Sequence, residues 1–110
     1  MYLIKMKTIL PKELNEKLKS EKVFILDVRA EEKFKKEHIE SSINIPKTYL
    51  FDLQGQNTEP IANLPKNKEI IVTCTTGNSA KKCATILEEK GYQVTVLEGG
   101  LMAWKELRDK

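Results

Sequence analysis

The strongest constraint on the fold is a short run of apolar residues, Val23–Leu26, that no polar residue interrupts. A strand with apolar side chains on both faces must be covered on both faces, which is typical of a parallel sheet. Ile70–Val72 repeats the pattern, and Gln93–Leu97 is a further candidate strand. Segments with helical spacing separate these strands, so the sequence predicts an alternating α/β fold.

The predicted elements alternate along the whole chain. Strands are expected at Thr8–Ile9, Val23–Leu26, Ile43–Ile45, Glu69–Thr73 and Gln93–Leu97. Helices are expected at 11–19, 30–37, 80–90 and 101–108, with single helical turns near 49–53 and 61–64. Phe34 is the expected core contact of the second helix, and Gly91 the expected C-cap of the third. The predicted fold class is therefore α/β with three layers, a mostly parallel central sheet of about five strands with helices on both faces.

Composition narrows the class of protein. The chain has 110 residues, of which 40% are hydrophobic and 32% charged, a balance typical of one soluble globular domain. The sequence contains no run of eighteen apolar residues, so it predicts no membrane-spanning helix. The segment Met1–Lys7 is too short and too rich in lysine for a signal peptide, so a cytoplasmic location is expected.

The few cysteines and histidines exclude several kinds of site. Two cysteines are too few for a disulfide scaffold, and with one histidine they predict no metal site. We also expect no cofactor. The net charge is +3, and the lysines are spread among acidic residues. This pattern predicts neither a nucleic-acid surface nor a membrane surface, but it favours small anionic substrates.

A cysteine stands at the junction between a buried strand and a helix. Cys74 follows Glu69–Thr73 and begins a short loop before the helix at 80–90. Backbone N–H groups and the helix dipole converge on such loops and stabilise a thiolate, the nucleophilic form of cysteine. From the loop alone, a nucleophile and a small core residue both remain open. Cys83 shares the apolar face of the following helix and is predicted to be a buried structural residue.

In a parallel α/β sheet the site lies beyond the carboxyl ends of the strands. Three segments are expected to meet there: Asp27–Arg29, the cysteine loop, and Glu98–Gly100. Together with flanking residues they resemble the rhodanese (sulfurtransferase) domain family. The matching segments are Leu26–Arg29, Phe34, His38–Ile39, Asn44–Pro46, Cys74–Asn78, Glu98–Gly100 and Ala103–Trp104.

The resemblance implies a single rhodanese-like domain over residues 1–110. It implies that Cys74 carries sulfane sulfur as a persulfide, taken from thiosulfate or a persulfide donor. The acceptor would be cyanide or a thiol, and the thiol would belong to a small molecule or a protein. The implied substrate-binding loop consists of Thr75, Thr76, Gly77, Asn78 and Ser79. Asp27 and Arg29 are expected to support the site as an ion pair or loop anchor, with contact to the substrate as the alternative. His38 is expected to fix a loop by hydrogen bonding.

The loop departs from the family pattern at its ends. Ser79 and Ala80 stand where many active members have Arg and Ser, and Thr75 stands where a basic residue is frequent. We expect Ser79 to cap the following helix through its hydroxyl group. A serine cannot bind an oxyanion in the bidentate way that a guanidinium can, so we expect a less cationic pocket and weaker use of thiosulfate. Lys81 and Lys82 are expected to lie on a solvated helix face.

Two alternative functions remain open. A rhodanese-like binding or regulatory module with weak catalysis is supported by the missing loop arginine and opposed by the retained Cys74. A cysteine phosphatase or arsenate reductase would need a loop normally one residue longer, with arginine near its end. The loop of residues 74–79 is shorter and carries no arginine.

Overall fold

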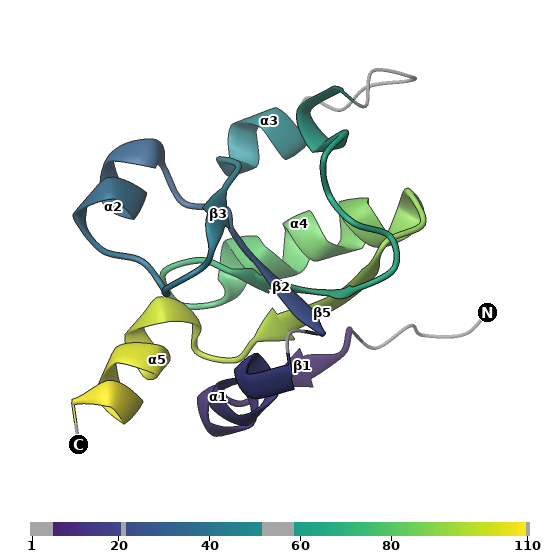
Figure 1. The fold of residues 1–110 in the computed structure, drawn as a ribbon. Helices are drawn as coiled ribbons and strands as arrows, with labels where there is room; N and C mark the ends of the chain where they lie inside the picture. The colour runs from purple at the N-terminus through teal and green to yellow at the C-terminus, as the bar shows by residue number, and fades with distance from the viewer. Residues whose placement is uncertain (1–5, 21, 52–58, 110) are drawn as a thin grey trace.

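The computed structural model describes residues 6–20, 22–51 and 59–109. Its centre is a five-stranded sheet in which every paired strand runs parallel to its neighbour. The strands are β1 (Thr8–Ile9), β2 (Val23–Asp27), β3 (Ile43–Asn44), β4 (Glu69–Thr73) and β5 (Gln93–Leu97), in the order β1-β5-β4-β2-β3 (Figure 1). The predicted α/β fold with a parallel sheet of about five strands is confirmed.

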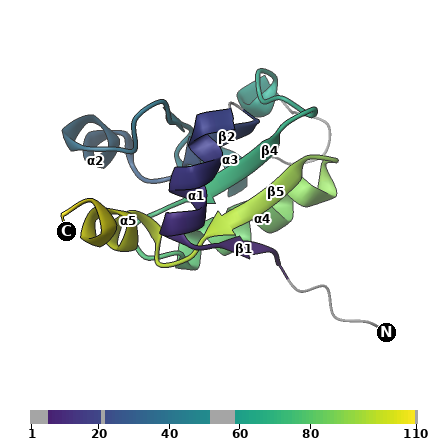
Figure 2. The same ribbon diagram turned by 60° about the horizontal axis from the view of Figure 1, so that its bottom comes forward.

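Helices cover both faces of the sheet, as predicted. They are α1 (Pro11–Lys17), α2 (Glu31–Lys36), α3 (Lys47–Phe51), α4 (Asn78–Glu89) and α5 (Gly100–Arg108), with 3₁₀ turns η1 (Leu18–Ser20) and η2 (Glu59–Ile61). Figure 2 shows α1 and α5 on one face, and α3 and α4 on the other. None of the described helices is long and apolar enough to cross a membrane.

The uninterrupted apolar runs are explained by two separate cores. Ile25 and Ile71 belong to the core beneath α1 and α5, which also contains Trp104. Leu26 and Ile70, their neighbours along the strands, belong to the core beneath α3 and α4. Because successive side chains of a strand point to opposite faces, each run contributes to both cores. At the start of β2, Val23 and Phe24 are partly buried, and each packs against a different core.

Two predicted details of the helices have different outcomes. Gly91, at φ +94°, ends α4 as expected, and the N–H of Tyr92 donates to the carbonyl of Leu87 at 3.1 Å. The prediction that Phe34 anchors the second helix in the core was wrong. No residue of α2 is buried, and the ring of Phe34 instead stacks on His38 with 3.9 Å between ring centroids. Residues 52 and 53 of the turn expected near 49–53 lie outside the described residues.

The register of the sheet places two chain segments side by side at its carboxyl edge. Asp27 pairs with Thr73, the last residue of β4. The N–H of Val28 donates to the carbonyl of Thr73 at 2.9 Å, so the pairing continues one step beyond β2. The residues that follow these two strands therefore emerge next to each other, and this positions the site.

Candidate active site

Cys74 is the first residue after β4 and lines a pocket. Only 5% of its surface is exposed. The pocket has a volume of about 350 Å³. We call it the thiol pocket; its lining residues are Val28, Arg29, Ala30, Lys33, Lys47, Cys74, Thr75, Thr76, Asn78 and Ser79. In Figure 1 the segment between β4 and α4 lies between α2 and α5, at the carboxyl edge of the sheet.

Backbone N–H groups at the start of α4 donate to the sulfur. The N–H of Gly77 lies 3.0 Å from Cys74 Sγ, and the N–H of Ala80 lies 3.4 Å from it. Gly77 is the N-cap of α4 and adopts φ +109°, a conformation that favours glycine. Glycine has no side chain to cap the helix, so the sulfur accepts the N–H that a capping oxygen would normally bind. Two donors and a helix N-terminus stabilise negative charge on this sulfur.

The structure corrects the expected role of Ser79. The helix begins at Asn78, two residues earlier than predicted, so Ser79 lies inside its first turn and provides no side-chain cap. Its hydroxyl oxygen instead accepts a hydrogen bond from Lys47 Nζ at 3.4 Å. Ala80, which stands where many active family members have serine, contributes its backbone N–H to the sulfur.

The N-terminus of α5 holds the cysteine loop through backbone hydrogen bonds. The N–H of Leu101 donates to the carbonyl of Cys74 at 2.8 Å, and the N–H of Met102 donates to that of Thr75 at 3.1 Å. Gly100 permits this approach, because a Cβ there would lie 2.5 Å from the carbonyl oxygen of Cys74. The predicted third segment therefore meets the loop, but it fixes the loop's backbone and does not line the thiol pocket.

Asp27 and Arg29 form a buried ion pair beside the pocket. Arg29 Nη2 lies 2.7 Å from Asp27 Oδ2, and Arg29 Nε lies 3.0 Å from both carboxylate oxygens. The same Nη2 donates to the carbonyl of Glu37 at 2.7 Å. Asp27 is fully buried and Arg29 is 8% exposed. Buried charges are stable only when paired, and this network ties the segment after β2 to the residue that follows α2.

Two lysines that sequence reasoning missed line the thiol pocket. Lys33 comes from α2 and Lys47 from the start of α3. Lys81 and Lys82, which the sequence placed on a solvated face, are exposed and do not line it. The pocket is therefore more cationic than the loop sequence predicted. No local motif marks either pocket lysine, because each reaches the site from a different part of the chain.

Cys83 and His38 lie apart from the thiol pocket. Cys83 is fully buried in the core beneath α4. Burial raises the pKa of its thiol to about 12, with a further increase from Cys74, so it stays protonated at neutral pH. His38 is exposed, and its Nδ1 donates to the carbonyl of Phe34 at 2.7 Å, consistent with the expected loop-fixing contact. Among the described residues, no three His, Cys, Asp or Glu side chains cluster as metal ligands would.

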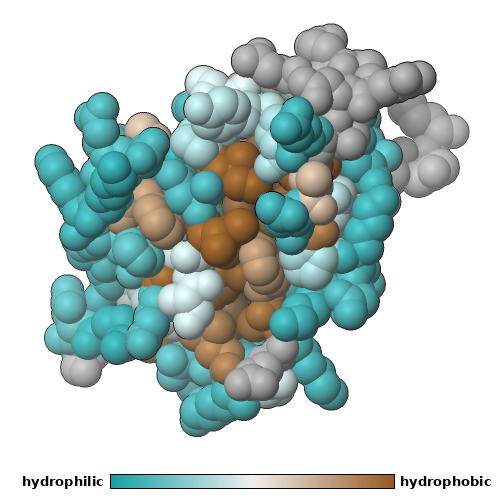
Figure 3. All heavy atoms as spheres, turned by 45° about the horizontal axis from the view of Figure 1, so that its top comes forward, coloured by the Kyte–Doolittle hydropathy of each residue, from teal (hydrophilic) through white to brown (hydrophobic). Residues whose placement is uncertain are grey.

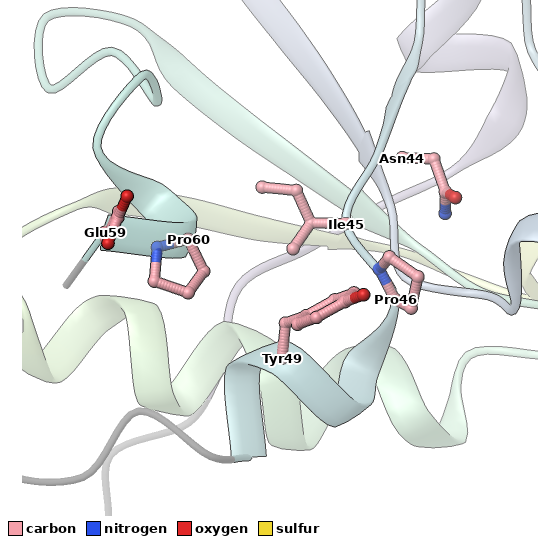
Figure 4. A pocket seen from close by; sticks show the side chains of 6 residues that line it. All are labelled: Asn44, Ile45, Pro46, Tyr49, Glu59 and Pro60. Atoms are coloured by element: carbon pink, nitrogen blue, oxygen red, sulfur yellow. The ribbon is translucent and has the colours of Figure 1, made fainter. Parts of the chain in front are cut away.

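A second pocket lies beside α3 and has a different character. It has a volume of about 360 Å³ and is lined by Asn44, Ile45, Pro46, Tyr49, Glu59 and Pro60. Figure 4 shows Ile45, Tyr49 and Pro60 around an apolar space, with the Asn44 side chain directed away from it. Apolar side chains also gather in the middle of one face of the molecule, between hydrophilic ones (Figure 3). Neither cysteine lines this second pocket.

A parallel α/β sheet with a loop cysteine at its carboxyl edge defines the class of protein. The model of the rhodanese-like domain family matches residues 10–107, and the chain belongs to that family. YtwF of Bacillus subtilis (strain 168), whose name contains the term sulfurtransferase, is 29% identical over 93 residues. That match covers 84% of this chain and 84% of YtwF.

Solved structures show the same fold. A rhodanese-like domain protein from Staphylococcus aureus is 30% identical with a TM-score of 0.78, and the match covers 90% of this chain and 91% of that one. Reduced CoADR-RHD of Bacillus anthracis is 27% identical with a TM-score of 0.81; the match covers 94% of this chain but 17% of that one. The chain also spans half or less of several further curated relatives.

Proposed function

We propose that this protein is a sulfurtransferase in which Cys74 carries sulfane sulfur as a persulfide. The observation that supports this most directly is that Cys74 lines a pocket and its sulfur accepts hydrogen bonds from the N–H groups of Gly77 and Ala80. These donors favour the thiolate, which is the nucleophile in sulfur chemistry. Membership of the rhodanese-like family and the sulfurtransferase name of a relative support the same class of reaction.

The proposed reaction has two steps that balance without a cofactor. In the first step the Cys74 thiolate attacks the outer sulfur of thiosulfate. A new S–S bond forms, the old S–S bond breaks, and sulfite leaves with the electron pair. In the second step a thiolate or cyanide attacks the outer sulfur of the persulfide, and Cys74 leaves as the thiolate. A persulfide donor would enter the first step in the same way, with a thiolate as the leaving group.

The remaining loop residues are proposed to bind the donor. The carbonyl groups of Cys74 and Thr75 face α5. Because C=O and N–H point in opposite directions across a trans peptide, the N–H groups of Thr75 and Thr76 point away from α5. The Thr75, Thr76, Asn78 and Ser79 side chains line the pocket, and Gly77 provides the turn. Asp27 and Arg29 are proposed to hold the wall rather than to react.

The test is intact-mass measurement after incubation with thiosulfate or an organic persulfide. We expect wild-type protein to gain the mass of one sulfur atom and to lose it again when a thiol or cyanide is added. Cys74→Ser should gain none, whereas Cys83→Ser should behave as wild type, because Cys83 is buried and protonated. No gain with any donor, or an equal gain in Cys74→Ser, contradicts the proposal.

The same protein preparation tests the two alternative functions. Tight binding of a partner without sulfur transfer favours the binding or regulatory module. Hydrolysis of a generic aryl phosphate above background, abolished by Cys74→Ser, favours the phosphatase class. We expect neither result, since the two cysteine-directed N–H groups and the retained thiol suit a persulfide carrier.

A further inference from the structure

The positive charge that faces the thiol pocket comes from outside the cysteine loop. Among the described residues, its cationic lining consists of Arg29, Lys33 and Lys47. The guanidinium of Arg29 is already bound by the Asp27 carboxylate and the carbonyl of Glu37. The two ammonium groups are therefore the charges left to act on a bound anion.

Lys47 is the better placed of the two lysines because its backbone is fixed to the pocket wall. Its N–H donates to the carbonyl of Val28 at 2.9 Å. Two residues earlier, the N–H of Ile45 donates to the carbonyl of Asp27 at 3.1 Å. Asn44 Nδ2 donates to the carbonyls of both Asp27 and Arg29 at 2.9 Å. Lys33, by contrast, lies on α2, which has no buried residue.

The side chain of Lys47 reaches the far wall of the pocket. Its Nζ lies 3.4 Å from Ser79 Oγ, in the first turn of α4, where residue 79 itself brings no charge. The charge also acts beyond the pocket surface. Although burial dominates and raises the pKa of Cys83, the ammonium of Lys47 lowers it. The ammonium therefore acts electrostatically on the same region of the molecule that holds Cys74.

We propose that Lys47 determines the specificity for the sulfur donor, by binding the anionic leaving group while Cys74 attacks the sulfane sulfur. This inference rests on the proposed function. When thiosulfate reacts, the bond to the sulfonate sulfur breaks and the electron pair leaves with sulfite. The leaving group gains charge in this step, and an ammonium beside it stabilises that charge. Lys47 would then favour donors whose leaving group is strongly anionic.

The experiment compares two donors that differ by one negative charge, thiosulfate and methanethiosulfonate. Both deliver an outer sulfur to Cys74, and they release sulfite or methanesulfinate. We expect Lys47→Met to slow persulfide formation from thiosulfate by about 10- to 100-fold, the value of a charge-assisted contact. The rate with methanethiosulfonate should fall less, so the ratio of the two rates falls. The readout is the time course of the intact mass.

Two further variants separate charge from structure. Lys82→Met removes an exposed lysine of α4 that does not line the pocket, and should leave the rate ratio unchanged. Ser79→Arg in the Lys47→Met background returns a cation to the same corner of the pocket and should restore much of the ratio. If Lys47→Met leaves the ratio as in wild type, this inference alone is overturned. If wild-type protein gains no sulfur from either donor, both this inference and the proposed function fail.

Discussion

The two cysteines are both buried and nine positions apart in sequence, yet their surroundings differ in almost every respect. Cys74 receives two backbone N–H groups and lines an open pocket with lysines in its wall. Cys83 has no exposed surface and packs in the apolar core beneath α4, where burial raises the pKa of its thiol to about 12. Burial alone therefore does not decide what a thiol can do.

The difference has a structural origin in α4. Cys74 precedes the helix and meets its unpaired N–H groups, whereas Cys83 lies within the helix, where backbone groups bond to one another. A thiolate at Cys74 would gain hydrogen bonds from these N–H groups. A thiolate at Cys83 would lose its hydration, with no hydrogen bonds to replace it. One helix thus donates N–H groups to a sulfur at its beginning and buries another on its apolar face.

The largest expected effect is on the relative reactivity of the two thiols. At pH 7–8 we expect iodoacetamide to modify Cys74 in the folded protein. Cys83 should react at least about a thousandfold more slowly than a free cysteine, because its pKa of about 12 leaves almost no thiolate. Peptide mass mapping measures both sites, and both should react readily in denaturant. Comparable labelling of the two cysteines in folded protein would contradict the predicted difference in their reactivity.

A second effect concerns the backbone that supports only the first cysteine. Gly100→Ala should lower the free energy of unfolding by about 2–4 kcal/mol and slow persulfide formation, since its Cβ would meet the Cys74 carbonyl at φ +61°. Gly91 follows the C-terminal end of α4 at φ +94° and does not touch the cysteine loop. Gly91→Ala should lower the free energy of unfolding by about 1–2 kcal/mol without slowing sulfur transfer. Urea unfolding and the mass assay measure both. If the two variants lose the same stability and transfer sulfur at the same rate, the close approach of α5 to the cysteine loop is unimportant.

A third effect is a pH dependence of stability that the buried thiol of Cys83 should cause. Burial raises the pKa of its thiol from 9.0 to about 12, so above pH 9 the unfolded chain loses this proton while the folded chain keeps it. Wild-type stability should then fall by about 1 kcal/mol per pH unit more steeply than that of Cys83→Ala between pH 9 and 12. Below pH 9 the two pH profiles should run parallel. Urea unfolding at stepped pH measures the difference, and identical slopes throughout would contradict it.

Much of the fold was predictable because its signals are local. The uninterrupted apolar run of β2 indicated a sheet covered on both faces, and the apolar face of α4 indicated that Cys83 is buried. The role of Phe34 was not predictable in this way. An aromatic residue in a short charged helix resembles a core anchor, but its actual partner, His38, lies beyond the end of that helix.

The sequence by itself determined the parallel architecture, the family and the position of a cysteine at a strand-to-helix junction. Only the tertiary structure decided what surrounds that sulfur. The N–H of Ala80 carries no side-chain signature, and Lys47 reaches Ser79 from a segment 32 positions away. The reason is physical: hydrophobic periodicity is set by neighbouring residues, whereas the charges and dipoles around a site are set by segments that meet only when the chain packs.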